Sequence, residues 1–227
     1  MAASCEGESF AVEIIADHLI AAFAAANQIE TPYRHWLLTD CLPARDVDSV
    51  LELPFDAPSL NGVSGKRELH NATRRYFDQE NRAKFPCVEN VSRAFQNPKV
   101  IASIEDRFGI NLNGTYLRIE YAQDLNGFWL EPHTDIGVKA FTFLLYLSKD
   151  PQHADLGTDI YGENKHWVGR SPFASNAGLI FVPSTITYHG FEARPIDGVR
   201  KSLVINYVTN EWRAREQLAF PDQPIGS

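Results

Sequence analysis

A histidine and an aspartate stand two positions apart, just before a long apolar run. They are His133 and Asp135 in the segment EPHTDI, and the run FTFLLYL follows them. In an extended strand, residues i and i+2 point to the same face, so one imidazole and one carboxylate would be directed at the same point. One strand can present two metal ligands in this way, and many ordinary pairs of solvent-facing side chains have the same spacing.

A second histidine would complete a metal site. His189 lies in the segment STITYHGFEARP, several predicted strands after His133. In a closed double sheet the ends of those strands can meet. Two histidines and one carboxylate on one face form the facial triad of non-haem Fe(II) oxygenases, which leaves coordination positions open. The pattern predicts a metal site made of His133, Asp135 and His189.

An arginine and a serine follow this histidine on the next predicted strand, RKSLVINYV. Arg200, Ser202 and Val204 share one face of that strand, while Lys201 and Leu203 point the other way. Arginine is always charged and offers a planar fork to carboxylate oxygens. Arg200 could alternatively pair with a surface aspartate. Its order after the two histidines favours an inward position, where it would bind an anion.

The second half of the chain has the pattern of a β unit. From Asn111 onward, short alternating or apolar runs are separated by Gly, Pro, Asn and Asp. Several short strands at regular spacing are typical of a sandwich or barrel. The predicted strands are TYLRIEYAQ, FTFLLYLSKD, LGTDIYG, AGLIFVPS, TYHGFEARP and RKSLVINYV.

The first half reads mainly as helices. An apolar stretch, AVEIIADHLIAAFAAANQI, opens it, and CVENVSRAFQ and NPKVIASIEDRFG follow later. Asn97 is a good N-cap with Pro98 in the first turn, and Gly109 is a plausible C-terminal stop. We therefore expect one α+β domain over residues 1–227. Helices of about residues 1–110 would pack on the outside of a double-stranded β-helix (jelly-roll) core of about residues 111–210.

Charge and cysteine content exclude some functions. The 227-residue chain has a formal net charge of −8, which disfavours nucleic-acid binding because phosphate contacts dominate that affinity. Three cysteines, at positions 5, 41 and 87, fit no zinc or disulfide pattern, and a cytoplasmic location is expected. The opening apolar stretch contains Glu13, Asp17 and His18, and no basic segment precedes it. It predicts neither a signal peptide nor a membrane span.

The pieces LRIEY, PHTD, TFLLYLS, LGTDIY, GLIFVPS with HG after four residues, and DGVRKSLVINYV occur in this order. In this respect the chain resembles the Fe(II)/2-oxoglutarate-dependent dioxygenases, and among them the prolyl-hydroxylase-like branch. The resemblance covers residues 115–209. It departs from the pattern at Thr158, where that branch often has the second glycine of a Gly-Gly-acid segment.

This resemblance implies a jelly-roll core, Fe(II) bound by His133, Asp135 and His189, and 2-oxoglutarate and O2 as co-substrates, with ascorbate as a possible reductant. Arg200 and Ser202 would bind the far carboxylate of 2-oxoglutarate. The resemblance gives Tyr146 a similar role. Tyr121 would line the same cavity. Because Asp135 fills the carboxylate position, the resemblance implies hydroxylation rather than halogenation.

The expected function is therefore hydroxylation of an unactivated C–H bond of a small molecule, with release of succinate and CO2. A protein hydroxylase of the prolyl type is the alternative within the same family. A cupin-like metal isomerase or hydrolase would need further ligands and no anion site, so Arg200 and Ser202 argue against it. A non-catalytic jelly-roll binding module would have no need of three intact ligands.

Overall fold

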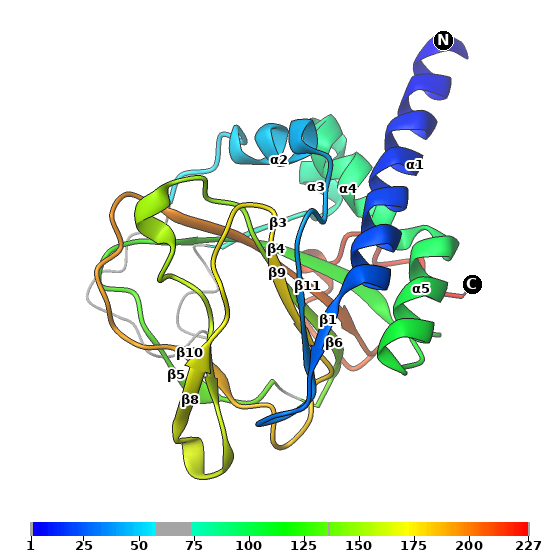
Figure 1. The fold of residues 1–227 in the computed structure, drawn as a ribbon. Helices are drawn as coiled ribbons and strands as arrows, with labels where there is room; N and C mark the ends of the chain where they lie inside the picture. Colours follow the sequence, from blue (N-terminus) through cyan, green and yellow to red (C-terminus); the bar gives the residue numbers. More distant parts are fainter. Residues whose placement is uncertain (1, 58–73, 136, 227) are drawn as a thin grey trace.

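Two antiparallel β-sheets pack against each other in the computed structural model, which describes residues 2–57, 74–135 and 137–226 (Figure 1). The larger sheet has the strand order β1-β2-β9-β6-β11-β4-β3, and the smaller one β5-β10-β7-β8. Side chains from both sheets meet in one apolar cluster that includes Tyr146 and Val204 from the larger sheet, and Ile160 and Phe191 from the smaller. The site lies between these two sheets.

The strands of the larger sheet run across the middle of the molecule in Figure 1. Their bounds are β1 Asn27–Ile29, β2 His35–Leu38, β9 Gly178–Phe181, β6 Lys139–Tyr146, β11 Arg200–Val208, β4 Tyr116–Asp124 and β3 Arg75–Tyr76. The strands of the smaller sheet are shorter: β5 Leu130–His133, β10 His189–Phe191, β7 Asp159–Tyr161 and β8 Trp167–Arg170.

Helices cover the outer face of the larger sheet, on the side away from the smaller one (Figure 1). They are α1 Ala2–Ala25, α2 Ala44–Leu51, α3 Gln79–Lys84, α4 Pro86–Gln96 and α5 Pro98–Phe108, and α1 packs against both α4 and α5. Helix α5 begins and ends as its sequence predicts. The Asn97 side chain accepts a hydrogen bond from the Lys99 amide, and Gly109 takes a left-handed conformation with φ 69° at the C-terminus.

Strict alternation along β11 divides its side chains between two buried layers. Leu203 and Ile205 belong to the apolar cluster beneath the helices, whereas Val204 belongs to the cluster between the sheets. Arg200 and Ser202 share the inward face with Val204 and line a cavity there. The parity expected for this strand from the sequence is thus observed.

The predicted α+β layout, with a double-sheet core and helices on its outside, is confirmed. One difference is that β1, β2 and β3 come from the first half of the chain and extend the larger sheet at both edges. Residues 54–65 are rich in Pro, Gly, Ser and Asn and predict a loop. This segment falls largely outside the described residues, and so does the basic stretch KRELHNATRR, which has the pattern of a solvated helix face. Among the helices that the structure describes, none combines the length and the apolar character needed to cross a bilayer.

Candidate metal centre

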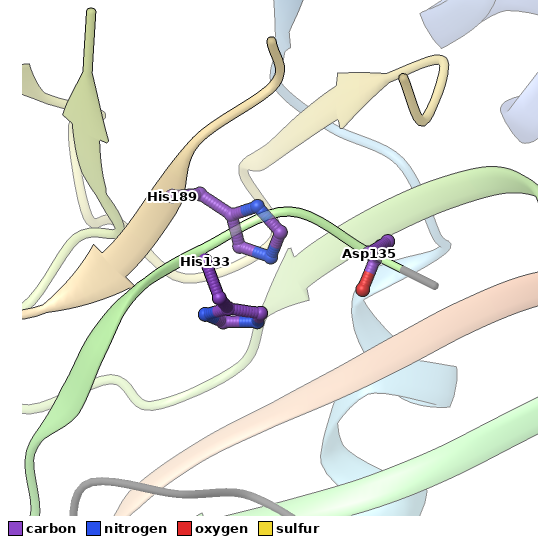
Figure 2. Close-up of side chains that lie close together, drawn as sticks. All are labelled: His133, Asp135 and His189. Atoms are coloured by element: carbon purple, nitrogen blue, oxygen red, sulfur yellow. The ribbon is translucent and has the colours of Figure 1, made fainter. Parts of the chain in front are cut away.

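The two histidines are neighbours across a pair of antiparallel strands. His133 ends β5 and lies directly opposite His189, which begins β10, and their ring centroids are 4.4 Å apart. Asp135 follows β5 by two residues and points to the same place (Figure 2). One ligand atom from each of the three residues lies within 4.8 Å of the others. The structure therefore brings the three predicted ligands together.

Backbone carbonyls orient both imidazole rings. Nδ1 of His133 lies 2.9 Å from the Glu131 carbonyl oxygen, and Nδ1 of His189 lies 3.0 Å from the Thr187 carbonyl oxygen. A carbonyl can only accept, so each Nδ1 carries the proton and donates it. The lone pair of each neutral ring is then on Nε2, which is the atom that a metal would use.

Asp135 is held by two donors. Lys139 Nζ lies 2.5 Å from Oδ1, and the Thr142 hydroxyl donates to Oδ2 at 2.5 Å. The carboxylate side chain is only 4% exposed. Burial opposes its ionisation, but the Lys139 ammonium, the nearby His189 and the Thr142 hydrogen bond together hold the pKa of Asp135 well below its ordinary value. Asp135 is therefore an anion at neutral pH, as a metal ligand must be.

His189 is kept neutral by its surroundings. Burial lowers its pKa to about 3, a shift that the Asp135 carboxylate opposes and that His133 reinforces. Phe181 packs against the ring, with centroids 4.6 Å apart. The ring is thus in the unprotonated form that binds a metal.

A cavity extends from the candidate metal ligands into the space between the sheets. Its walls carry polar groups at both ends and apolar side chains in the middle. The residues that line it are Phe128, Leu130, Asp135, Lys139, Thr142, Leu144, Tyr146, Thr158, His189, Gly190, Phe191, Arg200, Ser202 and Val204. The three residues expected to bind a carboxylate, Arg200, Ser202 and Tyr146, are in this set, whereas Tyr121, which was expected to line the cavity, is not.

Arg200 is buried and already has two partners. Its Nη1 donates to Asp124 Oδ2 at 2.5 Å and its Nε donates to the Leu156 carbonyl at 2.7 Å. Within the described part of the chain, its Nη2 makes no hydrogen bond, and neither does the Ser202 hydroxyl. The inner end of the cavity therefore offers a guanidinium edge and a hydroxyl to an anion.

Tyr146 lines the same cavity, but its hydroxyl is engaged. It donates to Thr158 Oγ1 at 2.8 Å and lies 2.6 Å from Ser171 Oγ. To bond a carboxylate, this hydroxyl would have to turn away from one of these partners.

Tyr121 does not join the site, which corrects the sequence-based expectation. It lies opposite Leu203 in the β4–β11 pairing and belongs to the cluster beneath the helices. The ring packs edge-on against Phe55, with centroids 5.7 Å apart. Its neighbours at ±1 on β4 face inward instead, so the predicted row of inward side chains is shifted by one residue.

Three residues of the site carried no separate prediction: Asp124, which pairs with Arg200, and Lys139 and Thr142, which contact Asp135. A weak signal for Thr142 exists in the sequence, because it shares strand parity with Tyr146. Asp124 ends a strand far from Arg200 in the sequence, and only the pairing of β4 with β11 brings the two together.

Comparison with known proteins gives matches of structure alone. No family model matches the sequence, and no curated protein matches it. A prolyl 4-hydroxylase from Phytophthora capsici matches with a TM-score of 0.58 at 12% identity, covering 88% of this chain and 66% of that one. This chain thus spans about two thirds of that enzyme's length.

Two further structures extend the comparison. A prolyl hydroxylase from Trichoplax adhaerens, solved with a peptide fragment of the hypoxia inducible factor oxygen degradation domain, matches with a TM-score of 0.58 at 15% identity, covering 94% of this chain and 96% of that one. The viral collagen prolyl hydroxylase of Paramecium Bursaria Chlorella virus-1, in complex with 2-oxoglutarate (2OG), has a TM-score of 0.52 at 9% identity, with coverages of 77% and 96%.

The chain has the fold of the Fe(II)/2-oxoglutarate-dependent oxygenases. These three structures that it matches are prolyl hydroxylases. At these identities the likeness concerns the fold, so the reaction has to be argued from the side chains of the site.

Proposed function

We propose that this chain is an Fe(II)- and 2-oxoglutarate-dependent oxygenase that hydroxylates an unactivated C–H bond of a small molecule, releasing succinate and CO2. One observation carries the proposal. His133, Asp135 and His189 converge at one end of a cavity whose other end holds the buried cation Arg200. A metal isomerase or hydrolase on the same fold would have no use for that cation.

The donor set fits Fe(II). Two imidazoles whose Nδ1 atoms donate to backbone carbonyls, so that each presents Nε2 to a metal, and one ionised carboxylate make a facial triad, which leaves positions open for other ligands. When bound there, the iron would supply the oxidation of the C–H bond with O2, coupled to decarboxylation of 2-oxoglutarate. The protein's own contribution is to orient the ligands and to enclose the reacting atoms between the two sheets.

The inner end of the cavity suits the far carboxylate of 2-oxoglutarate. Among the described residues, Arg200 Nη2 and the Ser202 hydroxyl have no hydrogen-bond partner there, and Tyr146 lines the same cavity. Phe191 packs on the Arg200 guanidinium, 4.9 Å from ring centroid to Cζ, which keeps water from that face. A charge-assisted pair shielded from water is stronger than an exposed one.

We propose a small molecule as the primary substrate, because the space beside the metal ligands is a narrow cavity between the two sheets. Lys139 and Thr142 line that cavity as its polar groups nearest the ligands. A peptide is the second candidate. It is favoured by the neighbours named prolyl hydroxylases, one of which was solved with a bound peptide fragment. The hydroxylation reaction would be the same for both candidates, but in one case a whole small molecule enters the cavity and in the other a side chain of a peptide does.

The test is succinate release by purified protein supplied with Fe(II), ascorbate and 2-oxoglutarate, with panels of small metabolites and of proline-containing peptides. We expect one or more metabolites to stimulate succinate release and to give a product about 16 Da heavier by mass spectrometry. This mass gain corresponds to one oxygen atom added to the substrate for each succinate formed. Stimulation by peptides alone would replace the small-molecule proposal. No 2-oxoglutarate turnover by an iron-loaded protein would reject the oxygenase.

The ligand assignment has a separate prediction. His189→Ala and Asp135→Ala should each reduce bound iron to background and abolish succinate formation, because each removes one of three ligands. His166→Ala, which changes an exposed histidine, serves as the control and should bind iron as the wild type does. Iron content by metal analysis decides the result, and wild-type iron in either ligand variant would contradict the assignment.

A further inference from the structure

A row of buried polar side chains crosses the inner face of the larger sheet beside Asp135. Thr142 on β6, Asn206 on β11 and Arg118 on β4 lie directly opposite one another in the register of three adjacent strands. Their exposed fractions are 1%, 0% and 3%. Such groups are costly to bury unless they are hydrogen-bonded, and nothing in the proposed reaction has used Asn206 or Arg118.

The hydrogen bonds in this row all run in one direction. Arg118 Nη1 donates to Asn206 Oδ1 at 3.2 Å, Asn206 Nδ2 donates to Thr142 Oγ1 at 2.9 Å, and Thr142 donates to Asp135 Oδ2 at 2.5 Å. We call these three bonds the Arg118–Asp135 relay. It ends on a metal ligand.

The chemistry of the groups fixes this direction. A guanidinium can only donate, so the atom of Asn206 that faces Arg118 must be its oxygen, and its NH2 must then face Thr142. The second amide hydrogen of Asn206 goes to the Phe141 carbonyl at 3.2 Å. A threonine hydroxyl has one proton. Because its oxygen accepts from Asn206, that proton is directed to Asp135.

Arg118 at the start of the relay is itself held on all sides. Its Nε donates to Gln217 Oε1 at 2.9 Å and its Nη2 donates to Glu120 Oε2 at 3.0 Å. Its guanidinium lies over the rings of Tyr76 and Trp212, at 4.8 and 4.9 Å from their centroids. The relay therefore starts from a fixed point and cannot reverse without breaking these contacts.

We propose that Asn206 and Arg118 are positioning residues of the metal site, acting through Thr142 on Asp135. The relay holds Oδ2 of Asp135 and fixes the carboxylate rotamer, so that Oδ1, which also accepts from Lys139 Nζ, is the oxygen directed at the metal site. This inference rests on the proposed function, because it takes the triad as a metal site. Outer partners of this kind are worth about 10- to 100-fold in metal affinity.

Two substitutions test the relay, and each replaces a side chain by one of nearly the same size. Thr142→Val removes the hydroxyl and should raise the dissociation constant for Co(II), used as the probe in metal-free protein, by about 10- to 100-fold. Asn206→Asp should have a similar effect, because a carboxylate only accepts and would draw the Thr142 proton toward itself. Thr142→Ser keeps the hydroxyl and should retain most of the wild-type affinity.

The decisive measurement is a double-mutant cycle on Co(II) affinity, in which binding is detected through the visible absorption of the bound ion. If Asn206 acts through Thr142, the variant with both Thr142→Val and Asn206→Asp should bind Co(II) no more weakly than the worse single variant. Additive losses, or an unchanged affinity for Asn206→Asp, would overturn the relay. A wild-type protein that fails to bind Co(II) would instead reject the proposed metal site.

A structural control separates positioning from loss of stability. Thr115→Val also removes the hydroxyl of a buried threonine, one that donates to the Leu112 carbonyl instead, and it should leave Co(II) affinity unchanged. Thermal unfolding of all metal-free variants is recorded alongside. If Asn206→Asp does not fold, Asn206→Ala replaces it in the same cycle and carries the same expectation, because Thr142 is again no longer held.

Discussion

The guanidinium of Arg200 serves two purposes at the level of a single residue. It neutralises the buried carboxylate of Asp124, with both side chains 7% exposed, and it presents a further edge to the cavity. Removing one partner of such a pair leaves a buried unpaired charge. A simple truncation of Arg200 would therefore mix a loss of stability with a loss of the proposed co-substrate binding.

A paired substitution distinguishes the two effects. Arg200→Met should lower the free energy of unfolding by about 3–5 kcal/mol because Asp124 is left unpaired. Adding Asp124→Asn removes that charge and should recover most of the loss. Both proteins should still show a KM for 2-oxoglutarate raised roughly 10- to 100-fold, as expected for a lost charge-assisted bond of about 1.5–3 kcal/mol.

Urea denaturation and the 2-oxoglutarate dependence of succinate release give the two readouts. A KM that returns to the wild-type value when Asp124→Asn restores stability would mean that Arg200 serves the fold alone, and that the co-substrate is bound elsewhere.

At the scale of elements, the site depends on how closely β5 approaches β10. Gly190, next to His189, has no room for a side chain: an added Cβ would lie 2.7 Å from the Leu130 carbonyl oxygen and 3.1 Å from that of Glu131. These are backbone atoms of the strand that carries His133, so they cannot move aside without moving β5. The glycine thus sets the distance between the two strands that present the imidazoles.

Gly190→Ala should therefore push β5 away from β10. We expect a decrease of about 1–3 kcal/mol in the free energy of unfolding, as for other overpacked sites, together with weaker metal binding because His133 moves relative to His189. Gly169→Ala, on β8 of the same sheet with no atom within 4 Å of the added Cβ, is the matched control. Equal Co(II) affinities for the two variants would contradict this role for Gly190.

The elements also show what the sequence could and could not predict. Alternation along β11 was sufficient to place Arg200, Ser202 and Val204 on one face, and all three line the cavity. The same reasoning failed for Tyr121 on β4. Both faces of the larger sheet are buried, one by helices and one by the smaller sheet, so hydrophobicity along a central strand does not tell which face is which.

Contacts between segments that are distant in the sequence also could not be predicted from the sequence. The order of histidine, aspartate, histidine and arginine along the chain is visible in the sequence, but the Arg118–Asp135 relay joins three strands through register alone. Register is set by the whole sheet. The sequence LRIEY therefore predicts a strand, whereas the position of its polar residues beside the candidate metal site is seen only in the structure.

For the whole molecule, burying the neutral His189 links folding to pH. Its pKa is about 3 in the metal-free folded chain, lowered by burial, against about 6.5 for an unfolded histidine. Between these two values the unfolded chain binds a proton that the folded chain does not. The free energy of unfolding must then decrease as the pH falls from about 6.5 toward 3. Asp135, whose pKa is lowered in the folded chain, contributes a further loss of stability only when the pH falls below the ordinary pKa of an aspartate.

His189→Gln removes this one titration while keeping a neutral side chain. Urea denaturation of metal-free protein between about pH 7.5 and pH 5 should show a smaller loss of stability in the variant than in the wild type, with the slopes differing by up to about 1.4 kcal/mol per pH unit, the value for one proton. Other titrating groups, including the buried His35, whose pKa burial also lowers, cancel in this comparison. Identical slopes would mean that the pKa of His189 is the same in the folded and the unfolded chain, so that burial does not favour the neutral imidazole that a metal site shared with Asp135 requires.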